Sequence, residues 1–248
     1  MPDWFTTPAG RKLAYHQTAG EGPGVVFLGG YKSDMTGTKA AHLQDWAEAT
    51  GRAFLRFDYS GHGQSEGRFE DGGIGDWFAD ARAIIAGLTT GPQVLVGSSM
   101  GGWIALLVAR AMPERVAGLV GVAAAPDFTA DLMWDRYSPA QKALLEGQGW
   151  LAEPSEYSDQ PNIITKAFLD DGANHLVLRT PLNLPFPVRL LQGTADTDVP
   201  PSVALRLLGH ATSPDLRLTL VKGADHRFST PDCLDLMVAA IAEVLGHA

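Results

Sequence analysis

A Gly-X-Ser-X-Gly pentapeptide is the feature of this sequence that points most directly to chemistry. It comprises Gly97-Ser98-Ser99-Met100-Gly101, follows the apolar segment QVLVG and opens the apolar segment GGWIALLVARAM. At a sharp turn from a strand into a helix, this pattern exposes the serine hydroxyl, and the flanking glycines remove Cβ clashes. The helix then directs its N-terminal amides at developing negative charge. We therefore predict Ser99 as a nucleophile, the alternative being that Ser98 and Ser99 only cap the helix.

A serine hydroxyl needs a base and an orienting acid, and both follow later in the chain. The strand-like segment VRLLQ leads into the polar loop Gly193–Pro200, which holds Asp196 and Asp198, and the segment Leu216–Val221 leads to His226. A neutral imidazole takes the serine proton, and a carboxylate fixes its tautomer and stabilises the imidazolium. We predict His226 as the base. Either aspartate could reach it, and Asp198 could instead cap the next helix; the place directly after the turn favours Asp196.

Two glycines after the first strand-like segment suggest where an oxyanion would bind. Gly29 and Gly30 allow the backbone to approach a substrate closely, and Tyr31 follows them. In a site of this kind, the residue after the nucleophile supplies one amide and the loop after an early strand supplies the second. We therefore predict the backbone N–H groups of Tyr31 and Met100 as an oxyanion hole. The alternative is that the glycines only form a turn.

The elements that must position these residues alternate along the chain. Short β-branched and aromatic segments bounded by Gly, Pro and Asp predict strands, and longer apolar segments between them predict helices, a pattern typical of an α/β fold with a mostly parallel, doubly wound sheet. Residues 1–248 are expected to form one domain, with a helical cap inserted at about 126–185. The predicted strands are Gly24–Gly29, Ala53–Asp58, Gln93–Gly97, Val116–Val122 and Val188–Gln192. The predicted helices are Thr38–Ala49, Gly75–Leu88, Gly101–Met112, Pro201–His210 and Cys233–Leu245.

The composition excludes several classes of protein. The net charge of -9 and the pI near 5.2 disfavour nucleic acid as a partner. Nine acids and three bases lie between Asp127 and Asp171, a local charge of 3 - 9 = -6, which favours a solvated cap surface over repulsion of anionic substrates. A single cysteine, Cys233, cannot form an internal disulfide. No uncharged apolar segment is long enough to span a bilayer, and the first residues lack a targeting pattern, so a cytoplasmic protein is expected.

Several motifs together resemble the α/β-hydrolase superfamily. They are FDYSGHGQS (Phe57–Ser65), VGSSMGGW (Val96–Trp103), GTADTDVP (Gly193–Pro200) and ADHRF (Ala224–Phe228). More narrowly, GYKSDMTGTKA, RFDYSG and GSSMGGW are similar to the abhydrolase domain-containing protein 10 branch, whose members are acyl-protein thioesterases and acyl-glucuronide esterases. The resemblance implies Ser99, Asp196 and His226 as a catalytic triad, selects Asp196 over Asp198, and implies depalmitoylation or ester cleavage.

The function predicted from these observations is hydrolysis of a carboxylic thioester or ester through an acyl-enzyme. The substrate is a small molecule or an acylated protein, with Trp103, Met133 and Trp134 as candidates for the acyl pocket. No phosphate-binding loop, dinucleotide fingerprint or zinc-binding helix motif is present, and a serine triad requires neither metal nor organic cofactor. The alternatives are a small-molecule carboxylesterase, perhydrolysis or carbon–carbon bond hydrolysis by the same triad, and a catalytically silent binding protein with this fold.

Overall fold

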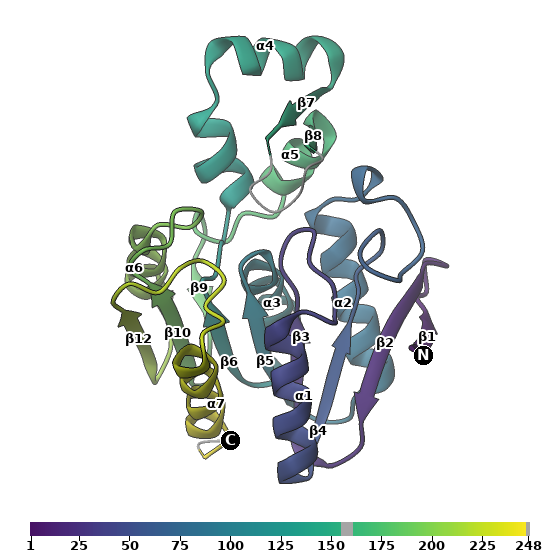
Figure 1. Cartoon of the computed structure of the whole chain (residues 1–248), viewed down its shortest axis with the longest axis vertical. Helices are drawn as coiled ribbons and strands as arrows, with labels where there is room; N and C mark the ends of the chain where they lie inside the picture. Colours follow the sequence, from purple (N-terminus) through teal and green to yellow (C-terminus); the bar gives the residue numbers. More distant parts are fainter. Residues whose placement is uncertain (155–160, 247–248) are drawn as a thin grey trace.

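An eight-stranded sheet forms the centre of the computed structural model, which describes residues 1–154 and 161–246 (Figure 1). The strand order is β1-β2-β4-β3-β5-β6-β10-β12. The pairs β1/β2 and β2/β4 are antiparallel, and all neighbours from β4 to β12 are parallel. The strands span Asp3–Thr6 (β1), Lys12–Thr18 (β2), Glu21–Leu28 (β3), Arg52–Phe57 (β4), Gln93–Ser98 (β5), Val116–Val122 (β6), Val188–Gly193 (β10) and Leu216–Val221 (β12).

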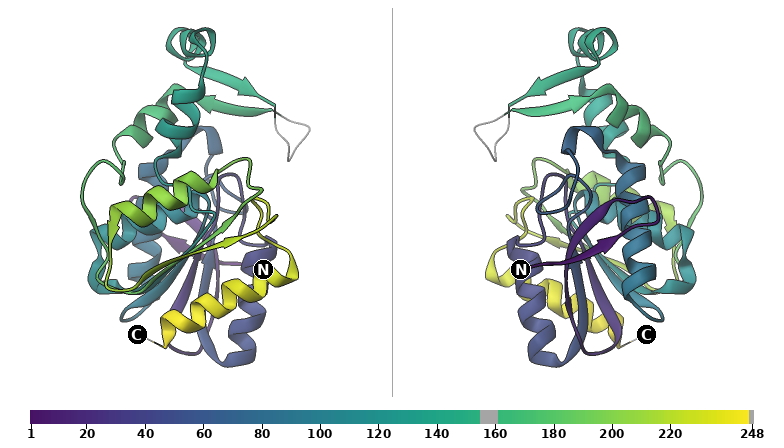
Figure 2. Two further views of the ribbon diagram at one scale, coloured as in Figure 1. Left: turned by 90° about the vertical axis from the view of Figure 1, so that its left-hand side faces the viewer. Right: turned by 90° about the vertical axis from the view of Figure 1, so that its right-hand side faces the viewer.

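Helices cover both faces of the sheet, as the predicted fold class requires (Figure 2). One apolar core lies between the sheet and helices α1 and α7, and the other lies beneath α2, α3 and α6. All residues of β5 and β10 are buried, which explains why both strands carry apolar residues on both faces. No described helix has the length and apolar character needed to cross a membrane. The helices span Thr38–Thr50 (α1), Ile74–Leu88 (α2), Met100–Ala111 (α3), Pro201–His210 (α6) and Pro231–Leu245 (α7).

The register of the parallel strands brings three loops together at one edge of the sheet. Leu28, the last residue of β3, lies beside Gly97 of β5, so the loop after β3 begins next to the Ser99 turn. Gly193, the last residue of β10, lies beside Val221, the last residue of β12. The loops that carry Asp196 and His226 therefore leave the sheet side by side. In open α/β sheets, ligands bind at the carboxyl ends of the strands, where these loops meet.

The chain between β6 and β10 leaves the sheet and forms a separate layer over this edge (Figures 1 and 2). We call its residues 127–181 the cap segment. The helices expected there are present, but an antiparallel strand pair, β7/β8, was not predicted. A short parallel pair, β9/β11, follows the cap segment. The elements are η3 (Thr129–Met133, a π-helical turn), η4 (Trp134–Arg136), α4 (Pro139–Gln148), β7 (Trp150–Glu153), β8 (Asn162–Thr165), α5 (Lys166–Ala173), β9 (Leu182–Asn183) and β11 (Ala211–Thr212).

Candidate active site

Ser99 lies at a sharp turn between β5 and α3, with backbone angles φ 54° and ψ -120°. A positive φ is a strained conformation for a residue with a side chain, and such strain is found at functional sites. Three backbone hydrogen bonds hold the turn. The Ser99 N–H donates to the Val122 carbonyl at 2.9 Å, and the Ser99 carbonyl accepts from Gly102 at 2.9 Å and from Ala125 at 3.0 Å. The neighbouring strand β6 and the segment after it therefore fix the serine in its strained position.

Ser99, His226 and Asp196 form a continuous hydrogen-bonded chain. His226 Nε2 lies 3.0 Å from Ser99 Oγ, and His226 Nδ1 lies 2.9 Å from Asp196 Oδ2. In the tautomer with a proton on Nδ1, the ring donates to Asp196 and accepts the serine proton on Nε2. The structure thus brings together the three residues that the sequence predicted as a triad, from the ends of three strands. The arrangement can transfer a proton from the serine hydroxyl to the imidazole.

Asp196 is 5% exposed, and protein groups surround its carboxylate. Oδ1 accepts the backbone N–H groups of Asp198 at 3.0 Å and Val199 at 2.8 Å, and Oδ2 accepts Gln192 Nε2 at 2.9 Å as well as His226. Burial alone raises the pKa of Asp196, but the hydrogen bonds from His226 and Val199 outweigh it and hold the pKa below its usual range. The carboxylate is therefore ionised and oriented before any substrate binds.

A cation site at the same residues does not fit this geometry well. One ligand atom from each of Asp196, Asp198 and His226 lies within 4.8 Å of the others. However, four hydrogen bonds occupy the approximately four lone-pair positions of the Asp196 carboxylate. The arrangement favours a proton relay over metal binding.

The predicted oxyanion amides flank the serine. Met100 is the first residue of α3, and its N–H is among the helix N-terminal donors that have no acceptor within the helix. Gly30 lies directly against the turn, since a Cβ added there would be 3.4 Å from Ser99 Cβ. Tyr31 follows Gly30 in the loop after β3. This placement is compatible with the predicted role of the Tyr31 and Met100 amides, which remains a prediction.

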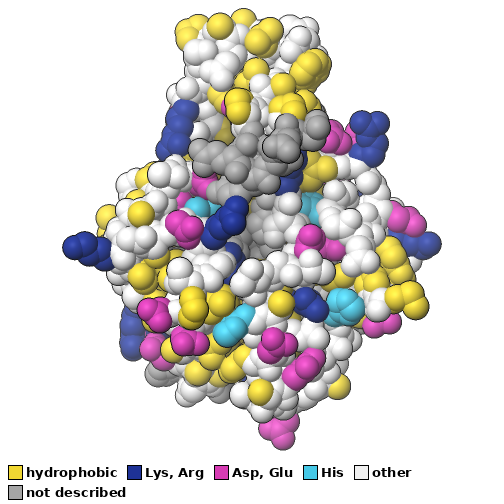
Figure 3. Space-filling model, viewed as in Figure 1, with side chains coloured by type: hydrophobic (Ala, Val, Ile, Leu, Met, Phe, Trp, Pro, Cys, Tyr) yellow, Lys and Arg dark blue, Asp and Glu magenta, His cyan; other side chains and the backbone are white. Residues whose placement is uncertain are grey.

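A cavity of about 840 Å³ extends from the triad towards the cap segment, and Ser99 and His226 form part of its lining. Its apolar wall includes Phe27, Tyr31, Ala125, Phe128, Leu132, Met133, Ile164 and Val199. Its charged lining residues are Lys32, Asp34, Lys39, Arg136, Glu153, Asp198 and Arg227. On the face drawn in Figure 3, hydrophobic side chains gather over the cap segment at the top. The cavity thus combines an apolar wall with a charged rim.

Of the three predicted acyl-pocket residues, only Met133 lines this cavity. Trp103 is fully buried under the cap segment, its Nε1 donates to the His175 carbonyl at 3.1 Å, and it does not line this cavity, so its predicted pocket role stays a prediction. Trp134 is half-buried, and the Lys142 ammonium lies 5.1 Å from its ring centroid. It does not line the cavity either. An aromatic residue near the site in sequence can pack in the core or line the cavity, and composition does not reveal which of the two it does.

Sequence reasoning missed most of the apolar residues of the cavity wall, among them three from the cap segment. Phe128 and Leu132 both line the cavity and are four residues apart, the spacing of one helical face. Ile164 joins them from β8. The spacing of Phe128 and Leu132 could have been recognised from the sequence. The position of Ile164 depends on the pairing of β7 with β8, which no local pattern specifies.

Burial also changes the protonation of groups around the cavity. It lowers the pKa of the Lys39 ammonium to about 8, with Asp225 opposing and Arg227 adding to the shift. Lys39 Nζ donates to the Arg227 carbonyl at 2.5 Å, one residue beyond His226. Burial raises the pKa of the Tyr31 hydroxyl far above its usual value and raises that of Glu153. Tyr31 is therefore a neutral hydroxyl at physiological pH.

A parallel sheet with helices on both faces, and a strained serine hydrogen-bonded to a histidine and a buried aspartate, define a serine hydrolase of the α/β-hydrolase fold. The family profile "Hydrolase_4: Serine aminopeptidase, S33" matches residues 24–171. The chain belongs to this family, and the protein is a hydrolase.

Two relatives agree with the narrower resemblance drawn from the motifs. "Palmitoyl-protein thioesterase ABHD10, mitochondrial" from Rattus norvegicus is 36% identical over 234 residues, which are 94% of this chain and 78% of the relative. The Homo sapiens protein of the same name is 37% identical over 234 residues, covering 94% of this chain and 76% of the relative. The resemblance to this branch is thereby confirmed.

Solved structures support the same fold. A putative hydrolase from Agrobacterium vitis S4 superposes with a TM-score of 0.94 at 41% identity, covering 98% of each chain. The α/β-hydrolase domain-containing protein 10 from mouse superposes with a TM-score of 0.92 at 33% identity, covering 99% of this chain and 98% of that one. The α/β-hydrolase fold predicted from the sequence is confirmed.

The expectation of a cytoplasmic protein is contradicted by these relatives. The rat, orangutan and human proteins are all named as mitochondrial. The expectation rested on the lack of a targeting pattern in the first residues of this chain. That lack carries no information about the compartment, which explains the error.

Proposed function

We propose that this protein hydrolyses acyl thioesters or oxygen esters through an acyl-enzyme on Ser99. The observation that carries the proposal is the chain from Ser99 Oγ to His226 Nε2 at 3.0 Å and from His226 Nδ1 to Asp196 Oδ2 at 2.9 Å, at one end of a cavity with an apolar wall. A serine, a base and an acid in this arrangement activate the hydroxyl for attack on a carbonyl carbon.

The proposed reaction has two stages. In the first, Ser99 Oγ attacks the acyl carbonyl while His226 takes its proton, and the amides of Tyr31 and Met100 bind the oxyanion. His226 then returns the proton to the leaving thiol or alcohol. In the second stage, His226 activates a water molecule that attacks the acyl ester of Ser99 and releases the carboxylic acid. Asp196 stays ionised throughout and stabilises the imidazolium that forms in each stage.

The names of the relatives and the lining of the cavity support a long acyl chain on a thiol. The rat and human relatives are named palmitoyl-protein thioesterases. In this chain, Tyr31, Phe128 and Leu132 line one side of the cavity, where an alkyl chain would bury apolar surface. We propose acyl-cysteine of a protein or an acylated small thiol as the substrate. Small oxygen esters are the second candidate because the same acyl-enzyme forms from either bond.

A fluorophosphonate probe tests the nucleophile and an acyl panel tests the substrate. The wild-type protein should become labelled on Ser99, and Ser99→Ala should not be labelled. Thioesters and oxygen esters of matched acyl chains, from acetyl to palmitoyl, then rank the substrates by kcat/KM. Equal labelling of Ser99→Ala, or no labelling of wild type, would rule out the proposed mechanism. Rates that fall steeply beyond short chains would rule out the long-chain substrate but not the mechanism.

A further inference from the structure

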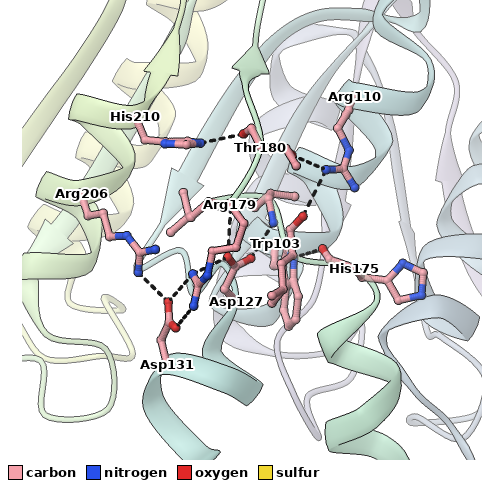
Figure 4. Close-up of polar contacts among 12 residues, drawn as sticks. Trp103, Arg110, Asp127, Asp131, His175, Arg179, Thr180, Arg206 and His210 are labelled. Atoms are coloured by element: carbon pink, nitrogen blue, oxygen red, sulfur yellow. Dashed lines mark hydrogen bonds and ion pairs between the residues drawn. The ribbon is translucent and has the colours of Figure 1, made fainter. Parts of the chain in front are cut away.

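A cluster of ion pairs lies at the base of the cap segment (Figure 4). We call Asp127, Asp131, Arg179 and Arg206 the cap-base cluster. Asp127 and Asp131 belong to the chain as it rises into the cap segment, and Arg179 belongs to the chain as it returns. Arg206 comes from α6, which packs on the central sheet. The cluster therefore links both ends of the cap segment to the body of the protein.

Asp127 fixes the lower part of this link. It is fully buried, and its carboxylate accepts the backbone N–H groups of Val177 at 2.8 Å and Leu178 at 3.0 Å, together with Arg179 Nη1 at 3.0 Å. Burial raises its pKa against the opposing effect of these hydrogen bonds. Removal of a buried carboxylate with such partners leaves several donors unsatisfied. Asp127 is therefore part of the framework that holds the rising and returning ends of the cap segment, its two stems, together.

Asp131 lies within the π-helical turn η3, one turn further into the cap segment. Its carboxylate accepts from Arg179 Nη1 at 2.9 Å, from Arg179 Nη2, and from Arg206 Nη1 at 2.6 Å. Burial raises the pKa of Asp131, but the hydrogen bonds from the two arginines outweigh it, and the pKa lies below its usual value. Arg179 moves with the cap segment because it belongs to the returning stem. Arg206 is thus the member of this cluster that ties the turn to the body.

The same turn supplies an apolar wall to the cavity. Phe128 precedes it, and Leu132 and Met133 form its end; all three line the cavity that contains Ser99. Asp131 is adjacent in sequence to Leu132, yet its carboxylate is bonded to α6. One short turn therefore carries an ion pair to the body and the wall against which an acyl chain would lie. Any movement of Asp131 relative to α6 must move Leu132 and Met133.

We propose that the Asp131–Arg206 ion pair sets the position of the Phe128–Leu132–Met133 wall and thereby the acyl-chain length that the active site accepts. Arg206 is a positioning residue, since it acts through η3. Without it, the turn keeps its bonds to Arg179 but loses its ion pair with α6. The turn can then shift outward, the cavity lengthens, and short chains lose contact with Leu132 and Met133. Long chains should then gain relative to short ones. The inference rests on the proposed function, which supplies the acyl chain. Its test measures inactivation of Ser99 and needs no acyl substrate.

The test uses p-nitrophenyl alkylphosphonates, in which Ser99 Oγ attacks phosphorus and p-nitrophenolate leaves. The second-order inactivation rate constants for the dodecyl and butyl compounds give a ratio that reports cavity length directly. For Arg206→Met the dodecyl-to-butyl ratio should rise by about threefold, a change that the loss of one partly exposed ion pair can support. Arg206→Lys, which keeps the charge but loses the guanidinium geometry, should lie between wild type and Arg206→Met.

Arg217→Met is the matched control. Arg217 is also partly exposed and forms ion pairs with Asp215 and Glu243. It lies near the amino end of β12, whereas the triad lies at the carboxyl ends of the strands. This variant removes one positive charge from the protein, as Arg206→Met does, and its ratio should equal that of wild type. A ratio in Arg206→Met that is unchanged, lower, or matched by Arg217→Met would overturn the inference.

Salt provides a second arm that needs no further variant. The Arg206 side chain is 44% exposed and that of Asp131 is 17% exposed, so molar salt screens their pairing. At each salt concentration, the dodecyl-to-butyl ratio of wild type is divided by that of Arg206→Met. This quotient should approach one as salt rises, and a constant quotient would contradict the proposal. If neither phosphonate inactivates the wild-type protein, the proposed function fails. If both do and the ratio is insensitive to Arg206, only the inference fails.

Discussion

Gly101→Ala should damage catalysis more than its size suggests, because Gly101 touches the strand end that leads to the predicted oxyanion loop. A Cβ at Gly101 would lie 2.0 Å from the Leu28 carbonyl oxygen and 2.5 Å from that of Gly29. An unstrained carbon–oxygen contact is about 3.3 Å, so the overlap with Leu28 is about 1.3 Å. Both oxygens belong to the backbone, and Leu28 is fully buried. The strain can be relieved only by separating the Ser99 turn from the end of β3.

Two losses of different size follow from that separation. Forcing a methyl group into a packed interior costs about 1–3 kcal/mol of the free energy of unfolding, and more where only backbone can move. Tyr31 lies two residues beyond Gly29, so its amide moves away from the position of the oxyanion. Loss of one oxyanion donor lowers kcat by about 10²–10³. Gly101→Ala should therefore lose more activity than its remaining folded fraction explains.

Urea unfolding and kcat on one acyl ester measure the two effects separately. Gly147→Ala is the matched control, because Gly147 lies in helix α4 and a Cβ added there would meet no neighbouring atom within 4 Å. Replacing a helical glycine with alanine should stabilise by about 0.5–1 kcal/mol. If Gly101→Ala folds with wild-type stability and kcat, the contact between the turn and β3 does not hold the oxyanion loop. A loss of stability with full kcat would refute the assignment of the Tyr31 amide.

Other predictions address the acid and two bases with lowered pKa values. Asp196→Asn should lower kcat by about 10⁴, as loss of a triad carboxylate does, and Asp198→Asn by less than about tenfold, in assays with saturating ester; similar losses would refute the choice of Asp196. The pKa of Lys39 is about 8 against 10.5 for a free lysine, so the unfolded chain binds more protons between these values. Wild type should gain stability over Lys39→Met as pH rises from about 8 to 10.5, measured by urea unfolding, and a constant difference would contradict it. The pKa of His62 is lowered to about 4 from 6.5, chiefly by burial. Wild type should lose stability relative to His62→Phe as pH falls from 6.5 to 4 in the same assay, and a pH-independent difference would refute it.

The triad was predictable because each of its residues is specified by a local pattern. Ser99 requires a strand, a turn with small neighbours and a helix, all within about a dozen residues. Asp196 and His226 each follow a strand directly, and parallel strands end at one edge of the sheet. No long-range pairing had to be known in order to place them. The choice of Asp196 over Asp198 came from its place directly after the turn and from the family resemblance, and the distance from Asp196 Oδ2 to His226 agrees with it.

Features that depend on distant pairing were not predictable in the same way. Strands β1 and β2 were missed because β1 is short and largely exposed, and its pairing with β2 gives no apolar signal. The acids of the cap segment were interpreted as a solvated surface. For Asp127 and Asp131 that interpretation is wrong, since they pair with Arg179 about fifty residues away. Two of the nine acids, Glu156 and Asp159, lie outside the described residues.

The sheet and the cap segment contribute different parts of the proposed site. This explains why the reaction type can be inferred from the sequence further than the substrate can. The three residues proposed to handle the proton all come from loops that begin at strand ends, and the register of β10 with β12 places two of those loops side by side. The wall proposed to meet the acyl chain comes from η3, and Asp131 of η3 is hydrogen-bonded to Arg179 and to Arg206 of α6. A substitution in the cap-base cluster can therefore change the accepted acyl group without moving the triad. Changes in specificity among relatives with this sheet should map to η3 and its partners, while changes in Ser99, Asp196 or His226 should lower turnover of every acyl group alike.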